Sequence, residues 1–220
     1  MYYNKYMSDY NNISKAVISR LPKYYRFLRE LMDQGVEKIS SNELSALMKS
    51  TASQIRQDLN NFGEFGQQGY GYNVSSLYKE IGSILGVEDA HNIIVIGAGN
   101  LGRAIVKYNG FSQHGFNFCS LFDVDTSLHG KSVNGVRIRS TDAMGEYIHK
   151  HHIDIAALTI PMDEARECSD TLYKLGIRYF WNFTNTDLEL PEDAIIKSVH
   201  LLDSLLELSY TICCENKKHL

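Results

Sequence analysis

A glycine-rich turn between an apolar run and a helical segment constrains the fold of this chain more than any other feature. The run Ile93–Ile96 is followed by the GxGxxG pattern Gly97-Ala98-Gly99-Asn100-Leu101-Gly102. In this pattern the first glycine makes the tight turn, the second lets a pyrophosphate approach the backbone, and the third lets helix and strand pack closely. The helix N-terminus that follows offers N–H groups and the positive end of its dipole to phosphate oxygens. We therefore expect residues 97–102 to bind a dinucleotide; the other reading is a plain glycine turn.

The segments around this turn alternate between short apolar runs and amphipathic stretches. Nearly continuous apolar runs are typical of parallel strands covered on both faces, and their alternation with helices is typical of a doubly wound sheet. The expected strands are 93–96, 118–122, 155–160 and 179–183. The expected helices are 101–108, 142–151 and 163–175. The second half of the chain is thus predicted to be a Rossmann-type doubly wound parallel sheet of the α/β class.

Two carboxylates end the second expected strand, in the run Phe122-Asp123-Val124-Asp125. A carboxylate at this strand end accepts hydrogen bonds from an adenosine ribose diol and repels a 2′-phosphate. We therefore predict that Asp123, with Asp125 beside it, favours NAD(H) over NADP(H). The alternative is an acidic strand end that is only solvated.

The first 85 residues follow a different pattern, of helices interrupted by one glycine-rich segment. A first helix carries Leu21–Leu31 at helical spacing with Pro22 in its first turn, and a second begins at the capping-box pair Ser40 and Glu43. The buried side of this second helix is expected to be Leu44, Leu47 and Met48. A third helix over 52–62 and a fourth over 74–85 flank the glycines of residues 63–72, which predict a β-hairpin.

Two short helices joined by a tight turn and followed by a hairpin describe a winged helix-turn-helix, whose second helix enters the major groove of DNA. With Ile55, Leu59 and Phe62 facing the core, the outward residues are polar and can bind base edges or phosphates. These candidate DNA-binding residues are Ser53, Gln54, Arg56, Gln57 and Asn60. An ordinary solvated helix face is the competing interpretation.

The charge distribution supports this division into two parts. The whole chain has a formal net charge of −4, but residues 1–80 carry ten Lys and Arg against eight Asp and Glu. The basic excess is therefore confined to the N-terminal part, where DNA binding is expected, and the acidic part is the expected nucleotide-binding domain.

The domain boundary is predicted near residues 86–91, which are short and polar. The four cysteines fit neither a zinc site nor a disulfide framework, so we expect no metal. The sequence shows no secretory signal and no apolar stretch of about 20 residues, so we expect a cytoplasmic protein with no membrane partner.

Taken together, the motifs resemble those of the Rex family of redox-sensing transcriptional repressors, from about Ile13 to Ile212. The most specific stretch joins Arg56-Gln57-Asp58-Leu59 to Phe62-Gly63-Glu64-Phe65-Gly66. Further matching segments are Arg20-Leu21-Pro22-Lys23-Tyr24-Tyr25-Arg26, Gly69-Tyr70-Gly71-Tyr72, Gly97–Gly102, Leu158-Thr159-Ile160-Pro161 and Asn182-Phe183-Thr184.

The resemblance implies a homodimer that binds operator DNA when NADH is scarce and releases it when NADH binds. It implies a winged helix-turn-helix over residues 1–86, a Rossmann NAD(H)-binding domain over 87–200, and a C-terminal swapped dimerisation helix and tail over 201–220. It adds Tyr108, Thr159, Pro161 and Asn182 to the cofactor site and Gln67, Gln68 and Tyr70 to the DNA site. It also implies a switch made of Arg26, Tyr108 and Asp203. The expected swapped helix, about Asp203–Cys214, has an apolar stripe consistent with burial in a dimer: Leu201, Leu205, Leu208 and Ile212, widened by Leu202 and Leu206.

The chain departs from the family pattern at four positions. Gln57, Gln67 and Gln68 stand where the family usually has cations, and Ser204 stands where it often has an apolar or aromatic group. Fewer cations release fewer counterions from DNA, so we expect modest, salt-sensitive operator binding.

Two other classes of function share some of these features. An NAD-dependent dehydrogenase with an appended helical domain would need an acid or base, and His149-Lys150-His151-His152 is the tempting cluster. This cluster precedes a strand, however, whereas such sheets bind ligands at the carboxyl ends of their strands. We therefore expect no catalytic residue. A protein-interaction module gated by the cofactor is the third class.

Overall fold

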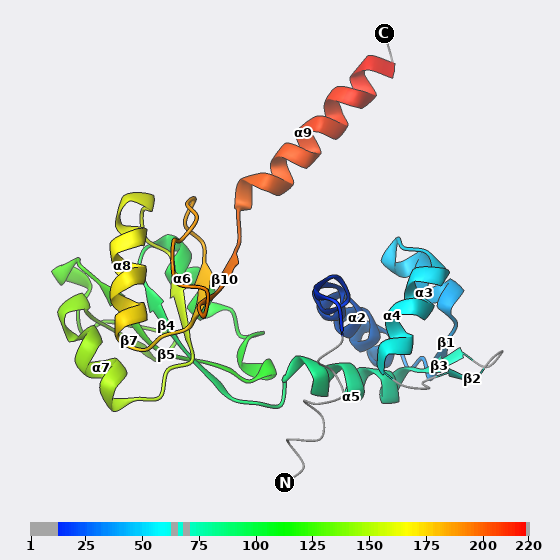
Figure 1. Cartoon of the computed structure of the whole chain (residues 1–220), viewed down its shortest axis with the longest axis horizontal. Helices are drawn as coiled ribbons and strands as arrows, with labels where there is room; N and C mark the ends of the chain where they lie inside the picture. The colour runs from blue at the N-terminus through cyan, green and yellow to red at the C-terminus, as the bar shows by residue number, and fades with distance from the viewer. Residues whose placement is uncertain (1–12, 63–65, 68–70, 219–220) are drawn as a thin grey trace. The chain divides into compact units, whose positions relative to one another are not determined.

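The computed structural model describes residues 13–62, 66–67 and 71–218 of the chain. The chain divides into two compact units, Met1–Asp89 and Ala90–Leu220, each with its own core (Figure 1). Each unit is described below by itself.

The first described element is the long helix α2, Lys15–Asp33, which begins earlier than the sequence pattern predicts. Ser14 caps it by accepting a hydrogen bond from the Val17 backbone, and the buried side chains of Val17 and Leu21 extend its apolar face toward the N-terminus. Pro22 therefore lies inside the helix rather than in its first turn, where it removes one hydrogen bond from the helix ladder. The expectation for Pro22 was wrong because burial of the preceding turn outweighs this loss.

Helices α3, Ser41–Met48, and α4, Ala52–Leu59, form the helix-turn-helix, and α4 continues into the 3₁₀ turn η1, Asn60–Phe62. The capping box predicted at Ser40 and Glu43 is present in full, and Thr51 caps α4. Leu44 and Met48 are buried as expected, but Leu47 is 45% exposed, so its assignment to the core was wrong. At eight residues α3 is short, and its core contact is confined to one narrow face.

The N-terminal unit is completed by a small antiparallel sheet and the helix α5, Val74–Leu85. The sheet has the order β1-β3-β2, with β1 at Lys38–Ile39, β2 at Gly66–Gln67 and β3 at Gly71–Asn73. β2 and β3 are the predicted hairpin, whereas the two-residue strand β1 is too short to leave a period-2 pattern in the sequence. Gly71 has φ +73, and a Cβ there would lie 2.7 Å from the carbonyl oxygen of Ile39.

The C-terminal unit is a seven-stranded sheet of order β10-β9-β8-β4-β5-β7-β6, parallel except for the β6–β7 hairpin (Figure 1). Its strands are β4 His91–Ile96, β5 Phe116–Asp123, β6 Ser132–Val133, β7 Val136–Ser140, β8 Ile155–Leu158, β9 Tyr179–Asn182 and β10 Ile195–Ser198. This confirms the predicted Rossmann-type parallel sheet. The strands β6, β7 and β10 were not predicted, because they are short, lie at or next to the edges of the sheet and lack a continuous apolar run.

Helices cover both faces of this sheet. Helices α7, Met144–Lys150, and α8, Met162–Lys174, share one core with Ile94 and Ile96, and α6, Asn100–Lys107, shares the other with Val95. The remaining short elements are 3₁₀ turns: η2 Ser112–His114, η3 Thr126–Leu128 and η4 Thr141–Ala143. Strand β4 is therefore buried on both sides, as its apolar sequence predicts.

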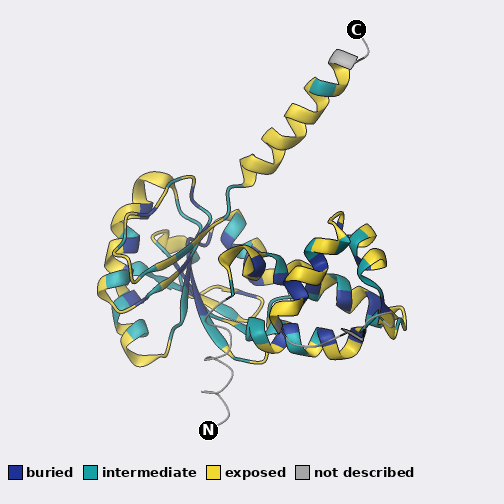
Figure 2. Ribbon diagram, turned by 45° about the vertical axis from the view of Figure 1, so that its right-hand side comes forward, coloured by how far each residue is buried: buried dark blue, intermediate teal, exposed yellow. Residues whose placement is uncertain are grey.

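The last helix, α9, spans Leu201–Lys218 and exposes its apolar stripe. Leu201, Leu205, Leu208 and Ile212 are between 50 and 60% exposed within the single chain (Figure 2). The helix is longer than the predicted Asp203–Cys214.

Candidate dinucleotide-binding and nucleic-acid-binding sites

A cavity of about 730 Å³ opens at the carboxyl ends of β4, β5 and β8. Strand β4 is followed in the chain by its neighbour on one side, β5, and the later strand β8 lies on its other side. The cavity thus lies at the topological switch point, where open α/β sheets bind their ligands. It is lined by Ile96, Gly97, Gly99, Phe122, Asp123, Val124, Thr141, Asp142, Met144, Thr159, Ile160, Pro161, Asp163, Glu164, Glu167, Cys168 and Thr171.

Two of the three motif glycines are required by the backbone geometry of the turn, and the third leaves open space. Gly97 has φ +98, and a Cβ there would lie 2.8 Å from the carbonyl oxygen of Thr159. At Gly102 a Cβ would lie 2.1 Å from the carbonyl oxygen of Gly97, so only glycine allows α6 to approach the turn. At Gly99 a Cβ would meet nothing within 4 Å, which leaves the cavity open against the backbone there.

The N-terminus of α6 is free of a side-chain cap. Gly99 occupies the N-cap position and has no side chain to accept hydrogen bonds from Asn100, Leu101 or Gly102. The first-turn N–H groups and the positive end of the helix dipole are therefore suited to an anion such as a pyrophosphate.

The Asp123 carboxylate is held at the end of β5 by two backbone groups. Its Oδ2 accepts from the Ala98 N–H at 2.6 Å and its Oδ1 from the Asp125 N–H at 2.8 Å. Ala98 is itself fully buried, so it contributes backbone rather than side chain to the site. Asp125 is exposed and outside the cavity lining, and hydrogen bonds from Ser127 hold its pKa below the usual range. The structure thus places Asp123 in the site and assigns Asp125 to the cap of η3.

Four further carboxylates line the cavity, and the sequence reasoning missed them. Asp163, Glu164 and Glu167 come from the first turns of α8, and Asp142 comes from η4. The signal in the sequence was the pair Asp163-Glu164, which follows strand β8 and Pro161 at the carboxyl end of the sheet, where ligands bind. With Asp123 they make the lining acidic, which disfavours a further phosphate group beside these carboxylates. The same wall holds Cys168, whose thiol has its pKa raised to about 11 by burial.

Thr159 and Pro161 lie on the cavity wall as predicted, with different roles for their side chains. The Thr159 hydroxyl donates to the carbonyls of Ile96 and Gly97 at 2.9 and 3.0 Å, and thereby ties β8 to the glycine turn. Pro161 precedes α8 and is exposed at the cavity edge.

Asn182 is fully buried, and its side chain is occupied by internal hydrogen bonds. Its Nδ2 donates to the Thr186 carbonyl and the Ser198 hydroxyl, and its Oδ1 accepts from the Thr184 N–H and hydroxyl. The side chain therefore holds the loop after β9 and does not line the cavity.

Tyr108 lies outside the cavity lining, at the C-terminal end of α6. It is 64% exposed, and its ring stacks edge-on against Phe111 at 5.1 Å. Phe111 contacts Phe118 and Trp181 in the same manner, so Tyr108 is the exposed end of an aromatic cluster.

The predicted DNA-binding residues of α4 differ in exposure and in whether their side chains form hydrogen bonds within the unit. Ser53, Gln57 and Asn60 are exposed, and Arg56 is exposed with one guanidinium nitrogen donating to the Ser41 hydroxyl at 2.9 Å. Gln54 is only half-buried, but its amide donates to the Asp58 carboxylate at 2.8 Å. Gln68 and Tyr70 lie outside the described residues, and Gln67 is described only by its backbone in β2.

Asp58 is the centre of a buried network that the sequence reasoning did not identify. Arg20 Nε and Nη2 each donate to its carboxylate at 2.7 Å, and the Tyr24 hydroxyl donates at 2.9 Å. Burial alone would raise the pKa of this carboxyl, but the hydrogen bonds from Arg20, Gln54 and Tyr24 hold it below the usual range. The network fixes α4 to α2 from inside the N-terminal unit.

The expected switch residues are exposed within the single chain. The Arg26 guanidinium lies 5.2 Å from the ring centre of Phe27, and Asp203 lies in the first turn of α9. The structure contains one chain, so it does not bring Arg26 and Asp203 of two subunits together.

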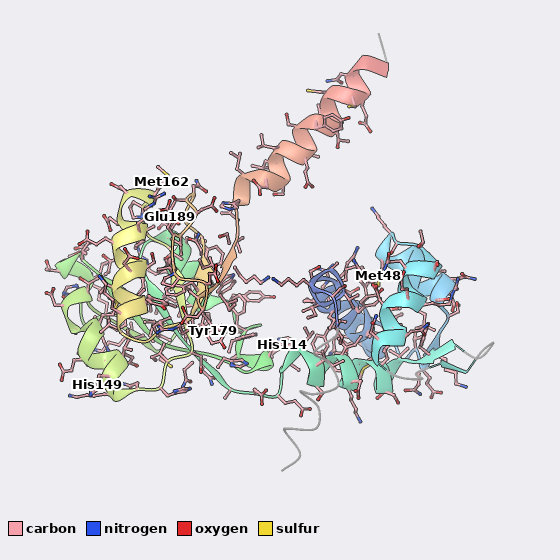
Figure 3. All side chains as sticks on the ribbon, in the orientation of Figure 1. Met48, His114, His149, Met162, Tyr179 and Glu189 are labelled. Carbon is pink, nitrogen blue, oxygen red and sulfur yellow. The ribbon has the colours of Figure 1, made fainter. Side chains whose placement is uncertain are left out.

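The histidine cluster, residues 149–152, precedes strand β8 and therefore lies at the amino ends of the parallel strands, whereas the cavity opens at their carboxyl ends. Figure 3 shows His149 at one end of the C-terminal unit and Met162, which begins α8, at the other. Within the described residues, no group of three His, Cys, Asp or Glu side chains could hold a metal ion. Among the helices described, none is long and apolar enough to cross a membrane.

Comparison with known families matches both units. Residues 12–60 match the family model "Putative DNA-binding protein N-terminus", and residues 88–186 match the model "CoA binding domain". The chain is 50% identical over 206 residues to the redox-sensing transcriptional repressor Rex of Caldanaerobacter subterraneus, covering 94% of this chain and 92% of the relative. It is also 50% identical to the Rex repressor of Clostridium novyi, covering 94% and 98%.

Comparison with solved structures also finds similarity to a Rex-family repressor. The chain is similar to the Rex-family repressor RSP in complex with β-NAD⁺ and operator DNA, with a TM-score of 0.87 and 48% identity over 94% of this chain and 95% of that one. It is equally similar to RSP in complex with β-NADH, with a TM-score of 0.87 and 44% identity over 95% and 98%.

Proposed function

The chain belongs to the Rex family of redox-sensing transcriptional repressors, and from this premise we propose which of its residues sense the cofactor and which bind the operator. Like its family, it is a DNA-binding repressor that responds to NADH and NAD⁺, and it is not an enzyme. A dehydrogenase with an appended helical domain is therefore excluded by its relatives.

The cofactor site is the cavity at the carboxyl ends of β4, β5 and β8. We assign the pyrophosphate to the backbone of residues 97–102 and the adenosine ribose to Asp123. Thr159 and Pro161 form the facing wall, Tyr108 lies toward the nicotinamide, and Asn182 acts by positioning its loop. The acidic lining supports NAD(H) over NADP(H) and over coenzyme A, both of which carry a further phosphate on the adenosine.

The operator site is the exposed face of α4, with Ser53, Arg56, Gln57 and Asn60 directed to DNA. The wing residues Gln67, Gln68 and Tyr70 belong to this site in the proposal, and Gln54 holds α4 in place through Asp58. A homodimer presents two such helices to successive major grooves. We propose that α9 supplies the dimer contact through its apolar stripe, and that the repressor acts in the cytoplasm.

Redox sensing then requires two states of the dimer with different spacings of the recognition helices. NADH supplies the charge-neutral, reduced nicotinamide that distinguishes them, and the switch residues Arg26, Tyr108 and Asp203 respond to its presence. A ligand shifts the equilibrium between two states only by its difference in affinity for them. To change the ratio of the two states from 1:99 to 99:1, the binding free energies must differ by about 5.5 kcal/mol.

The observation that carries the proposal is one chain holding an open, glycine-lined cofactor cavity and an exposed recognition helix. The test is operator binding by fluorescence anisotropy across NADH to NAD⁺ ratios at two salt concentrations. NADH should release the operator and NAD⁺ should not. NADH binding without any operator affinity would instead support a protein-interaction module.

A further inference from the structure

The turn of the helix-turn-helix has an unusual residue at its most constrained position. Helix α3 ends in a Schellman motif, in which the Ser50 N–H donates to the Ser45 carbonyl at 3.1 Å and the Lys49 N–H to the Ala46 carbonyl at 3.5 Å. Lys49 is left-handed, with φ 50 and ψ 49. Glycine is the usual residue here, because a Cβ makes this conformation costly.

Other non-glycine residues rarely adopt this conformation in the described parts of the chain. Asn134 is the other non-glycine residue with a positive φ in these parts, and asparagine tolerates a positive φ better than lysine does. A lysine kept at a glycine position has therefore a cost in stability that some other property of its side chain must offset.

The contacts of the turn do not provide that property. The carbonyl of Met48, the last residue of α3 and labelled in Figure 3, accepts from the Lys23 ammonium at 2.6 Å. Lys49 is exposed, and no hydrogen bond or ion pair of its ammonium is found within the described residues. A cation at the end of α3 is favoured by that helix dipole, but α4 begins three residues later and its positive end opposes the same charge.

The position of Lys49 relative to DNA is more informative. It lies two residues before Thr51, the N-cap of α4. The N-terminus of a recognition helix approaches the major groove, and cations beside it reach the flanking phosphates. Helix α4 contains one cation, Arg56, with Gln57 next to it. Of the nearby cations, Arg20 pairs with Asp58 and the Lys23 ammonium donates to the Met48 carbonyl.

We propose that Lys49 is a DNA-binding residue whose ammonium contacts a backbone phosphate beside the N-terminus of α4. Glycine at this position would relieve the turn but remove the charge. This inference rests on the proposed operator binding and adds to it a phosphate contact outside the recognition helix.

The test compares Lys49→Gly, Lys49→Asn and Lys49→Arg with the unchanged full-length chain. Binding is measured by anisotropy over a salt series on two duplexes: the operator of the RSP complex and a scrambled version of it. Lys49→Gly should raise the melting temperature yet weaken binding to both duplexes by a similar factor, about fivefold. The slope of log K against log salt should fall by about 0.9, the value for one phosphate contact.

The control variants separate charge from conformation. Lys49→Asn should weaken binding as Lys49→Gly does, and Lys49→Arg should restore it. Lys79→Ala, which removes an exposed cation of α5, should leave both binding and slope unchanged.

Three outcomes would overturn the inference. The first is a raised melting temperature with unchanged affinity and slope, and the second is weaker binding to the operator alone, which would indicate base reading. The third is an unchanged chain that binds neither duplex, which would overturn the proposed operator function as well.

Discussion

Gly99 and Gly102 are three residues apart in one turn, yet a methyl group would meet open space at the first and a backbone oxygen at the second. Gly99 has φ −71 and ψ −167, a conformation open to any residue. A single added methyl group at each position therefore allows an effect on ligand binding to be tested separately from an effect on folding.

We predict that Gly99→Ala leaves the thermal stability of the C-terminal unit unchanged but weakens NADH binding by roughly 10- to 100-fold, because the methyl group occupies the path of the pyrophosphate to the backbone. Gly102→Ala should instead destabilise the unit by about 3 kcal/mol through overpacking. Calorimetric titration with NADH and thermal unfolding distinguish the two variants. Wild-type affinity in Gly99→Ala would show that the pyrophosphate binds elsewhere.

Asp58 gives a residue-scale prediction for the N-terminal unit. Asp58→Asn should lower its free energy of unfolding by about 3 kcal/mol, because Arg20 and Tyr24 lose a buried charged acceptor. Arg20 is 34% exposed and can be partly solvated, which places the effect at the lower end of the range for broken buried pairs.

The same carboxylate predicts a pH dependence. Its pKa is lower in the folded state than the ordinary Asp value of 3.8, so its contribution to stability is complete above that value. The contribution is lost as the pH falls through the lower folded-state pKa, and Asp58→Asn should abolish this acid-side loss. Asp33→Asn, which breaks an exposed pair with Arg29, is the matched control and should change stability by about 0.5 kcal/mol or less.

At the scale of elements, helix α2 contains the clearest conflict between local preference and packing. Pro22→Ala should stabilise the N-terminal unit by about 2 kcal/mol. A proline inside a helix costs about 3 kcal/mol, and part of this cost is offset because proline also lowers the conformational entropy of the unfolded chain. Chemical denaturation measures the change. Pro161→Ala, at the start of α8, should alter stability far less, and equal effects at both prolines would contradict the reasoning.

Sequence patterns predict the elements that bury one continuous apolar face. Strands β4, β5, β8 and β9 and the helices between them are found at the predicted places, because the two-sided core around β4 leaves runs such as Ile93–Ile96 in the sequence. The strands β6, β7 and β10 were not predicted, because β6 and β10 are edge strands and β7, beside β6, alternates apolar with charged or polar residues. The parallel pairing of β7 with β5 and of β10 with β9 joins residues that are distant in the sequence.

In the candidate sites too, features set by the local sequence could be predicted and features set by tertiary contacts could not. The places of the glycines and of Asp123 beside the cavity could be predicted, because local backbone geometry determines them. Asp58 and Asn182 were not understood, because hydrogen bonds formed only in the folded chain decide whether a polar side chain faces a ligand or the core. Lys49 was missed because its conformation is visible only in the structure.

At the scale of the whole molecule, α9 carries apolar side chains that the single chain does not bury. We predict that Leu205→Glu converts the dimer to monomers, because the substitution introduces a charge where burial of each leucine is worth about 1.5–3 kcal/mol and occurs twice by symmetry. The dimer dissociation constant should rise more than a hundredfold, which analytical ultracentrifugation measures.

The control for this prediction lies on the same helix. Thr211→Glu adds the same charge away from the stripe and should leave the oligomeric state unchanged. An unchanged dimer in Leu205→Glu would show that α9 is not the contact.

The exposed stripe of α9 also links gene control to the amount of the repressor in the cell. If two chains must meet before either can hold paired half-sites, occupancy of the operator at low abundance rises with the square of the chain concentration. Dilution by growth during a pause in synthesis then lowers operator occupancy more steeply than in proportion to the chain concentration. If the leucines of α9 join two chains as we propose, they also make the regulator respond to its own concentration as well as to the redox state.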